Sequence, residues 1–211
     1  MPFYRRNLPH WHPEGTALFL TWRLYGSLPV AVLRAMRAST TNPQNTARNG
    51  CATDDSPGKS FDLLDAALDK GSSGPRWLAD PEIAAYTEWP ILRCAELGRY
   101  VLHAYVIMPN HVHMLLEPHV PLAKITGVLK GVAARDANAT LVRIGKPFWQ
   151  DETFDHWLRN SAEFERIRHY IEWNPVSAGL AAKPEDWEWS SASRKFLSRS
   201  PIPGCAFAPL P

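Results

Sequence analysis

Two strand-like runs of the sequence are separated by only two residues. Residues 99–108 (RYVLHAYVIM) and 111–117 (HVHMLLE) are rich in the aromatic, β-branched and aliphatic side chains that favour strands. Pro109-Asn110 lies between them. A connection this short joins neighbouring strands that run in opposite directions. The sequence therefore predicts a tight antiparallel hairpin in the middle of the chain.

Helix and strand patterns surround this hairpin. Asp80 is a favourable helix cap followed by Pro81, and Ser161 with Glu163 opens a last helix that Pro175 must end within a turn. In chain order we expect a strand at 16–24, short helices at 29–36 and 61–70, a helix at 80–97, the hairpin, a basic helix at 121–143, a short strand at 154–158 and the helix from 161. This order favours an α+β fold in which helices cover one face of an antiparallel sheet.

Length and composition indicate a single folded domain. The chain has 211 residues, of which 45% are hydrophobic and 21% charged. We expect one domain over residues 1–195, a loop-like insertion at about 38–60 and an irregular tail at 196–211. No apolar run reaches the ~18 residues of a membrane helix and the polar start is no signal peptide, so we expect a cytoplasmic protein.

Positive charge is concentrated in two segments. Residues 1–37 hold five Arg against one Glu, and residues 121–146 hold five Lys or Arg against one Asp. The whole chain has a net charge of only +2. Two basic segments in a nearly neutral chain are compatible with an anionic polymer as partner, and solvated helix faces are the alternative.

His111 and His113 occupy alternate positions of the second hairpin strand. Side chains alternate between the two faces of a strand, so both imidazoles lie on one face. Two neutral imidazoles can bind one divalent cation if a third ligand meets them. A half-exposed histidine pair on a polar sheet face is the alternative for this pattern.

The segments around these histidines resemble a known family. MPNHVHMLLEP (108–118) looks like the histidine–hydrophobe–histidine (HUH) motif of the single-tyrosine transposases, and HYIEWNPVSAGL (169–180) is similar to their YIxxNPVxAGL segment. Further similar segments are 5–16, 19–24, 148–160, 164–171 and 185–192. Together they resemble the REP-associated tyrosine transposases, which act at repetitive extragenic palindromes in bacteria.

The resemblance implies a fold, a reaction and a set of site residues. It implies a ferredoxin-like α+β sandwich of the HUH endonuclease type, with the histidines on a central strand and Tyr170 on a helix packed alongside. Tyr170 would be the nucleophile that forms a covalent 5′-phosphotyrosine. His111, His113 and Asn174 would hold Mg²⁺ or Mn²⁺, although imidazole also accepts zinc or nickel. The expected partner is single-stranded or hairpin DNA with REP-like palindromes, bound by a monomer, with a dimer as the alternative.

Several basic and aromatic residues are candidates for DNA contact. Lys124, Arg135 and Lys146 have similar helical angles, because eleven residues make about three turns. Trp149 is a candidate for stacking on unpaired bases, and a core tryptophan is the competing interpretation. The full candidate set is Arg5, Arg6, Arg23, Lys124, Lys130, Arg135, Lys146 and Trp149.

Two other functions fit the same residues. The first is a domesticated hairpin-binding protein that no longer cleaves DNA. The second is a metal-dependent phosphodiesterase in which water attacks and Tyr170 is structural. Only the single-tyrosine transposase forms a covalent protein–DNA adduct.

Overall fold

The computed structural model describes residues 16–29, 32, 66–69 and 74–197. Its elements in chain order are β1 (Leu18–Arg23), η2 (Trp77–Ala79), α3 (Pro81–Glu96), β2 (Tyr100–Ile107), β3 (His111–Pro118), α4 (Leu122–Thr140), β4 (Phe154–Trp157), α5 (Ser161–Ser177), η3 (Pro184–Asp186) and α6 (Arg194–Leu197). Residues 66–69 are helical, within the helix expected at 61–70. The expectations for 38–60 and the tail from 198 lie outside the described residues, as does the helix at 29–36 except for residue 32, which is helical.

The four strands form one antiparallel sheet in the order β2-β3-β1-β4. The predicted hairpin is β2 and β3, and β3 pairs on its other side with β1. Strands and helices follow one another as β1-α3-β2-β3-α4-β4, which with this strand order is the ferredoxin-like arrangement. The predicted fold class is confirmed, and the histidine-bearing strand lies inside the sheet.

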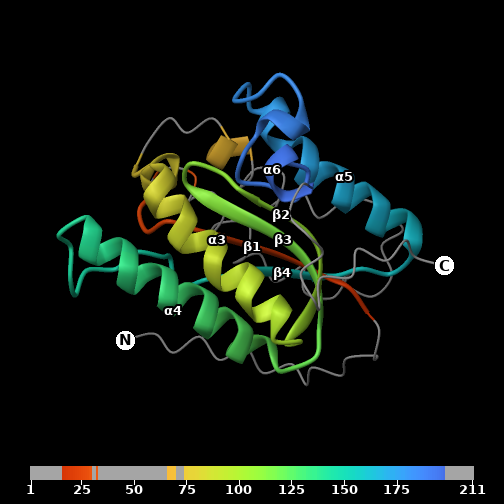
Figure 1. Cartoon of the computed structure of the whole chain (residues 1–211), viewed down its shortest axis with the longest axis horizontal. Coiled ribbons are helices and arrows are strands. Elements are labelled where there is room, and N and C mark those ends of the chain that lie inside the picture. The colour runs from red at the N-terminus through yellow and green to blue at the C-terminus, as the bar shows by residue number, and fades with distance from the viewer. Residues whose placement is uncertain (1–15, 30–31, 33–65, 70–73, 198–211) are drawn as a thin grey trace, which may run out of the picture.

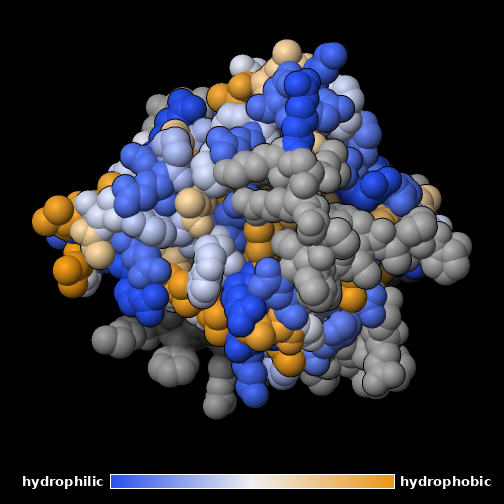
Figure 2. Space-filling view, viewed as in Figure 1, coloured by the Kyte–Doolittle hydropathy of each residue, from blue (hydrophilic) through white to orange (hydrophobic). Residues whose placement is uncertain are grey.

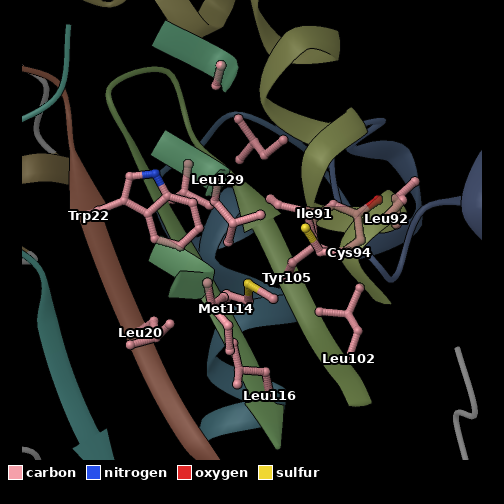
Figure 3. Packing of buried hydrophobic residues seen from close by; sticks show 14 of the residues in the cluster. Leu20, Trp22, Ile91, Leu92, Cys94, Leu102, Tyr105, Met114, Leu116 and Leu129 are labelled. Atoms are coloured by element: carbon pink, nitrogen blue, oxygen red, sulfur yellow. The ribbon is translucent and has the colours of Figure 1, made fainter. Parts of the chain in front are cut away.

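Helices cover both faces of the sheet. Helices α3 and α4 lie side by side over one face (Figure 1), and Leu20, Trp22 and Met114 point from the strands into the apolar core beneath them (Figure 3). Helix α5 packs on the opposite face through Phe164, Ile167 and Ile171. The expectation that helices cover one face is therefore wrong. Both faces are covered because the inner strands carry apolar side chains on each face of the sheet, and both sets of side chains must be buried.

The helix ends follow local capping rules, although the cap of one helix differs from the expected residue. Asp80 accepts a hydrogen bond from the Glu82 amide at 2.9 Å and starts α3. The cap of α5 is Asn160 rather than Ser161, because the Asn160 side chain accepts from the Glu163 amide. Helix α5 then continues two residues past Pro175, as far as Ser177.

The visible surface is mostly polar. Figure 2 shows hydrophilic side chains with apolar ones between them over α3 and α4, and an apolar edge where Figure 1 places the turn after α4. That turn carries Val142 and Ile144, which are 89% and 83% exposed. None of the helices in the described part of the chain combines the length and apolar character that a bilayer span requires.

Candidate active site

The register of the sheet places both histidines beside β1. Thr21 pairs with His113 and Arg23 pairs with His111 across the β1–β3 ladder. Both imidazoles are completely buried, on the face of the sheet that α5 covers. The prediction that both imidazoles lie on one face is confirmed. The alternative of a half-exposed histidine pair is wrong, because both side chains are buried.

Asn110 determines which nitrogen of His111 faces the site. His111 Nδ1 lies 2.7 Å from Asn110 Oδ1, while Asn110 Nδ2 donates to the Leu68 carbonyl at 2.9 Å. An amide oxygen only accepts, so His111 Nδ1 carries the proton and Nε2 keeps its lone pair. Burial, and secondarily the neighbouring His113 ring, lower the pKa of His111 well below its ordinary value. His111 is therefore neutral, which is the form of histidine that binds metals.

Thr21 contacts the outer nitrogen of the second imidazole. Its hydroxyl oxygen lies 2.7 Å from His113 Nδ1, and both side chains are buried. If the hydroxyl accepts from Nδ1, the lone pair of His113 Nε2 also faces the site. The two Nε2 atoms are 3.0 Å apart, a distance at which two lone pairs need a proton or a cation between them.

Helix α5 brings Tyr170 and Asn174 to this pair. Tyr170 Oη lies 3.5 Å from His113 Nε2, and Asn174 Nδ2 donates to Tyr170 Oη at 3.3 Å. The Tyr170 ring packs edge-on against Phe19 and His113. Their spacing of four residues places Tyr170 and Asn174 on one helix face, as the sequence indicates. The fold thus assembles a phenol, an amide and two imidazoles from β3 and α5.

The donor set fits a divalent cation. The two Nε2 atoms are 3.0 Å apart, close enough for both imidazoles to hold one divalent cation. Asn174 Oδ1 is buried and has no hydrogen-bond partner among the described residues. Within the same part of the chain, no three His, Cys, Asp or Glu side chains converge as a ready metal cluster. An amide oxygen is therefore a suitable further ligand.

Arg23 lies on the same face, opposite His111 in the strand register. It is 7% exposed, and its Nη1 has no hydrogen-bond partner among the residues that the structure describes. Burial lowers its pKa and the charge of Glu152 opposes that change. Arg23, which pairs with His111 across the ladder, remains a candidate for phosphate contact.

Two of the residues predicted to contact DNA make internal contacts in the fold. Lys130 Nζ donates to the carbonyl oxygens of Gln150 and Asp151 at 2.7 and 3.0 Å, which ties α4 to the segment before β4. Trp149 is 6% exposed, packs against Trp22 and donates from its indole to the Lys130 carbonyl. The core interpretation of Trp149 is the one that the structure supports, because the side chain is buried among Trp22 and Phe148.

The remaining basic candidates are distributed over the surface. Arg135 and Lys146 line a groove of about 720 Å³ together with Ile144, whereas Lys124 is exposed near the other end of α4. Lys146 lies beyond the end of α4 at Thr140, so the expected three-residue helical stripe does not exist. Arg5 and Arg6 lie outside the described residues.

Sequence reasoning missed three residues that contact the histidine pair. They are Thr21, Asn110 and Asp69, whose Oδ1 lies 3.8 Å from His111 Nε2. Asn110 adjoins the motif, and its position in the hairpin turn was a usable signal. Thr21 and Asp69 are far from the histidines in sequence, and no local pattern marks them.

The ferredoxin-like sheet thus presents two imidazoles from an inner strand to a tyrosine on helix α5. Residues 82–174 match the family model "Transposase IS200 like". The match covers a little under half of the chain and includes both histidines, Tyr170 and Asn174.

Five chains of known structure are also similar. One is described as "Structure of the REP associates tyrosine transposase bound to a REP hairpin"; it has 18% sequence identity, a TM-score of 0.49, and the alignment covers 96% of this chain and 90% of that one. No curated protein matches the sequence.

Proposed function

We propose that this protein nicks and rejoins single-stranded or hairpin DNA through a covalent bond between Tyr170 and a 5′ phosphate. The observation that carries the proposal is the position of Tyr170 Oη, 3.5 Å from His113 Nε2 in a site whose two imidazoles present their Nε2 atoms to each other. The same proposal includes one domain over residues 1–195 and a monomeric protein. REP-like palindromes are the substrate to test, because the sequence motifs resemble the REP-associated branch.

His111, His113 and Asn174 would hold a divalent cation, for which we propose Mg²⁺ or Mn²⁺. When bound, such a cation supplies a Lewis acid for an oxygen of the scissile phosphate. Asn110 and Thr21 would keep both imidazoles oriented toward it, the role that hydrogen-bond partners of metal-binding histidines commonly have.

The chain's own residues account for the exchange of bonds. The bond from Tyr170 Oη to phosphorus forms, and the bond from phosphorus to the 3′ oxygen breaks. The phenol loses one proton and the departing 3′ oxygen gains one, so the step is balanced without water or ATP. The Asn174 amide donates to Tyr170 Oη and would stabilise negative charge that develops there. Attack by another 3′ hydroxyl reverses the step and joins the strand.

The test is detection of the covalent adduct with and without the phenol oxygen. Tyr170→Phe keeps the ring that packs against Phe19 and His113, so stability and DNA affinity should change little. The substrate is a 3′-labelled single-stranded DNA with a palindromic hairpin, incubated with Mn²⁺ and resolved on a denaturing gel. We expect a protein-linked band for the parent and its complete loss for Tyr170→Phe.

Tyr86→Phe is the matched control. Its hydroxyl donates to Glu82 on α3, remote from the histidine pair in the fold, so the adduct should form as in the parent. Cleavage by Tyr170→Phe at the parent rate would mean that water is the nucleophile, as in the phosphodiesterase alternative. Hairpin binding by the parent without any cleavage would support the domesticated alternative.

A further inference from the structure

Helix α5 carries a pair of stacked, exposed rings on the same turn as Tyr170. His169 and Trp173 are both exposed, and 42% of Trp173 is accessible to solvent. The two ring centroids are 5.3 Å apart and the ring planes differ by 16°. His169 directly precedes Tyr170 and Trp173 lies three residues after it, so the ring pair borders the phenol on the helix surface.

The ring pair lies where the surface of α5 turns from the sheet toward solvent. Successive residues of a helix are about 100° apart. Going round the helix, the order is the buried Ile167, the half-buried Tyr170, the ring pair, and then Arg168 in its ion pair with Glu165. Tyr170 therefore separates the ring pair from the packed face of α5, and the rings flank the site on its solvent side.

Packing within the protein does not require these rings to be exposed. A side-chain pair four residues apart stabilises a helix by only about 0.2–0.5 kcal/mol, and smaller residues provide as much. An exposed tryptophan that stacks on a second ring is, by contrast, a suitable surface for a flat ligand. Every nucleobase has a π-face that stacks on aromatic side chains, whatever the base.

The nearby charge indicates which flat ligand the surface fits. Arg166 lies one turn before His169, and its side chain is 44% exposed. Its Nη2 is 3.6 Å from Glu163 Oε1, which is too long for a hydrogen bond. The Glu163 carboxylate already accepts from His156 and from the Arg159 amide. A positive charge one turn from the rings suits the phosphate of a stacked nucleotide.

We propose that Trp173, supported by His169, stacks on an unpaired base of the DNA strand close to the scissile phosphate, and that Arg166 contacts the backbone of the same strand. This inference rests on the proposed function, because it requires DNA at Tyr170. It makes Trp173 a positioning residue, which holds the strand so that its phosphate lies in reach of the phenol.

The test is a double-mutant cycle between Trp173 and single bases of the DNA. The DNA is a labelled palindromic hairpin with single-stranded arms on both sides, and one arm nucleotide at a time is replaced by an abasic one. Affinity for the full chain is measured by fluorescence anisotropy without divalent metal. We expect one abasic position to weaken binding to the parent about 5- to 150-fold, the range for one base stacked on an aromatic side chain.

Trp173→Ala should weaken binding of the intact DNA by a similar factor. The abasic position should then have no further effect, because the base has lost its stacking partner. Trp173→Phe keeps an aromatic ring and should retain part of the sensitivity to that position. A merely structural role of Trp173 would lower affinity for the intact and the abasic DNA equally.

Trp89→Ala is the matched control. Trp89 is 60% exposed on α3, which lies over the opposite face of the sheet, so its removal should alter neither the affinity nor the response to abasic positions. The same response to abasic positions in the parent and in Trp173→Ala would overturn the stacking assignment. A changed sedimentation coefficient together with that result would assign Trp173 to contact with a second copy instead.

The adduct assay separates this inference from the proposed function. A covalent adduct of the parent, combined with an unchanged response to abasic positions in Trp173→Ala, would overturn the stacking assignment and leave the proposed function standing. Failure of the parent to bind the hairpin at all would overturn both.

Discussion

The chemistry of the histidine pair depends on which ring nitrogens carry protons. Asn110 decides this for His111, since its oxygen accepts from Nδ1. For His113 the corresponding residue is Thr21, whose hydroxyl is the contact at Nδ1 and is itself 3% exposed. A single buried hydroxyl therefore influences both the stability of the sheet and the direction in which the imidazole lone pair points.

Thr21→Val should lower both the stability of the protein and its affinity for Mn²⁺. The β-branched shape is kept, but the buried contact of His113 Nδ1 is lost, which costs about 1–3 kcal/mol of unfolding free energy. Mn²⁺ affinity should fall about 10- to 100-fold, as for other partners of metal-binding histidines. Urea denaturation and Mn²⁺ titration measure the two effects.

Thr87→Val is the control for Thr21→Val. Its hydroxyl is equally buried but donates to the Ile83 carbonyl within α3, on the other side of the sheet. Some stability should be lost and Mn²⁺ affinity should not change. Unaltered Mn²⁺ affinity in Thr21→Val would show that Thr21 does not orient a metal ligand.

At the scale of elements, the start of α5 is joined to β4 by Glu163. Its carboxylate accepts from the Arg159 amide at 2.8 Å and from His156 Nε2 at 2.9 Å, while its own amide donates to the Asn160 side chain. This reciprocal cap sets the position from which α5 carries Tyr170 to the sheet. Burial raises the pKa of Glu163, but the hydrogen bonds from Arg159 and His156 and the nearby positive charges outweigh it, so the pKa is lowered overall.

Glu163→Gln should destabilise the protein in a pH-dependent way. Hydrogen bonds to a charged group contribute about 1.5–3 kcal/mol, and their loss should appear in urea denaturation at pH 7. A lowered folded-state pKa means that the stabilisation is complete above the ordinary value of 4.5 and is lost as the pH falls through the lowered value. The difference between parent and variant should therefore shrink toward pH 3.

Glu165→Gln provides the comparison on the same helix. Glu165 pairs with Arg168 while 54% exposed, and exposed pairs contribute little. Glu165→Gln should change the free energy of unfolding by less than about 1 kcal/mol both at pH 7 and toward pH 3. An equally small effect of Glu163→Gln would mean that the cap does not hold α5 to β4.

At the scale of the whole molecule, we expect the positions of the basic residues to determine the path of bound DNA. Arg135 and Lys146 line one groove although they belong to α4 and the turn beyond it. Lys124 is eleven residues before Arg135, about 16 Å along the helix axis. Both groove residues are exposed, and Arg135 also pairs with Asp136 at 2.7 Å.

The groove should determine how DNA binding responds to salt. Each phosphate contact contributes about 0.7–0.9 to the slope of log affinity against log salt. The double variant Arg135→Ala/Lys146→Ala should therefore flatten that slope by about 1.5, and Lys124→Ala should leave it unchanged. Fluorescence anisotropy of a labelled hairpin over a salt series gives both slopes. Flattening by Lys124→Ala alone would place the DNA along the N-terminal half of α4 instead.

Local periodicity was enough to predict the hairpin, the helices and the shared face of His111 and His113. The spacing of Tyr170 and Asn174 likewise placed both on one helix face, because periods of two and 3.6 residues are properties of the backbone itself. Tertiary structure alone decided that α5 covers the face opposite α3 and α4, and that this face buries the histidines. Thr21 and Asp69 reach them only through strand pairing and packing between distant segments. Trp149 is buried and Lys130 half-buried for the same reason: which side of a helix or turn meets a neighbour depends on the order of the strands, and no local pattern encodes that order.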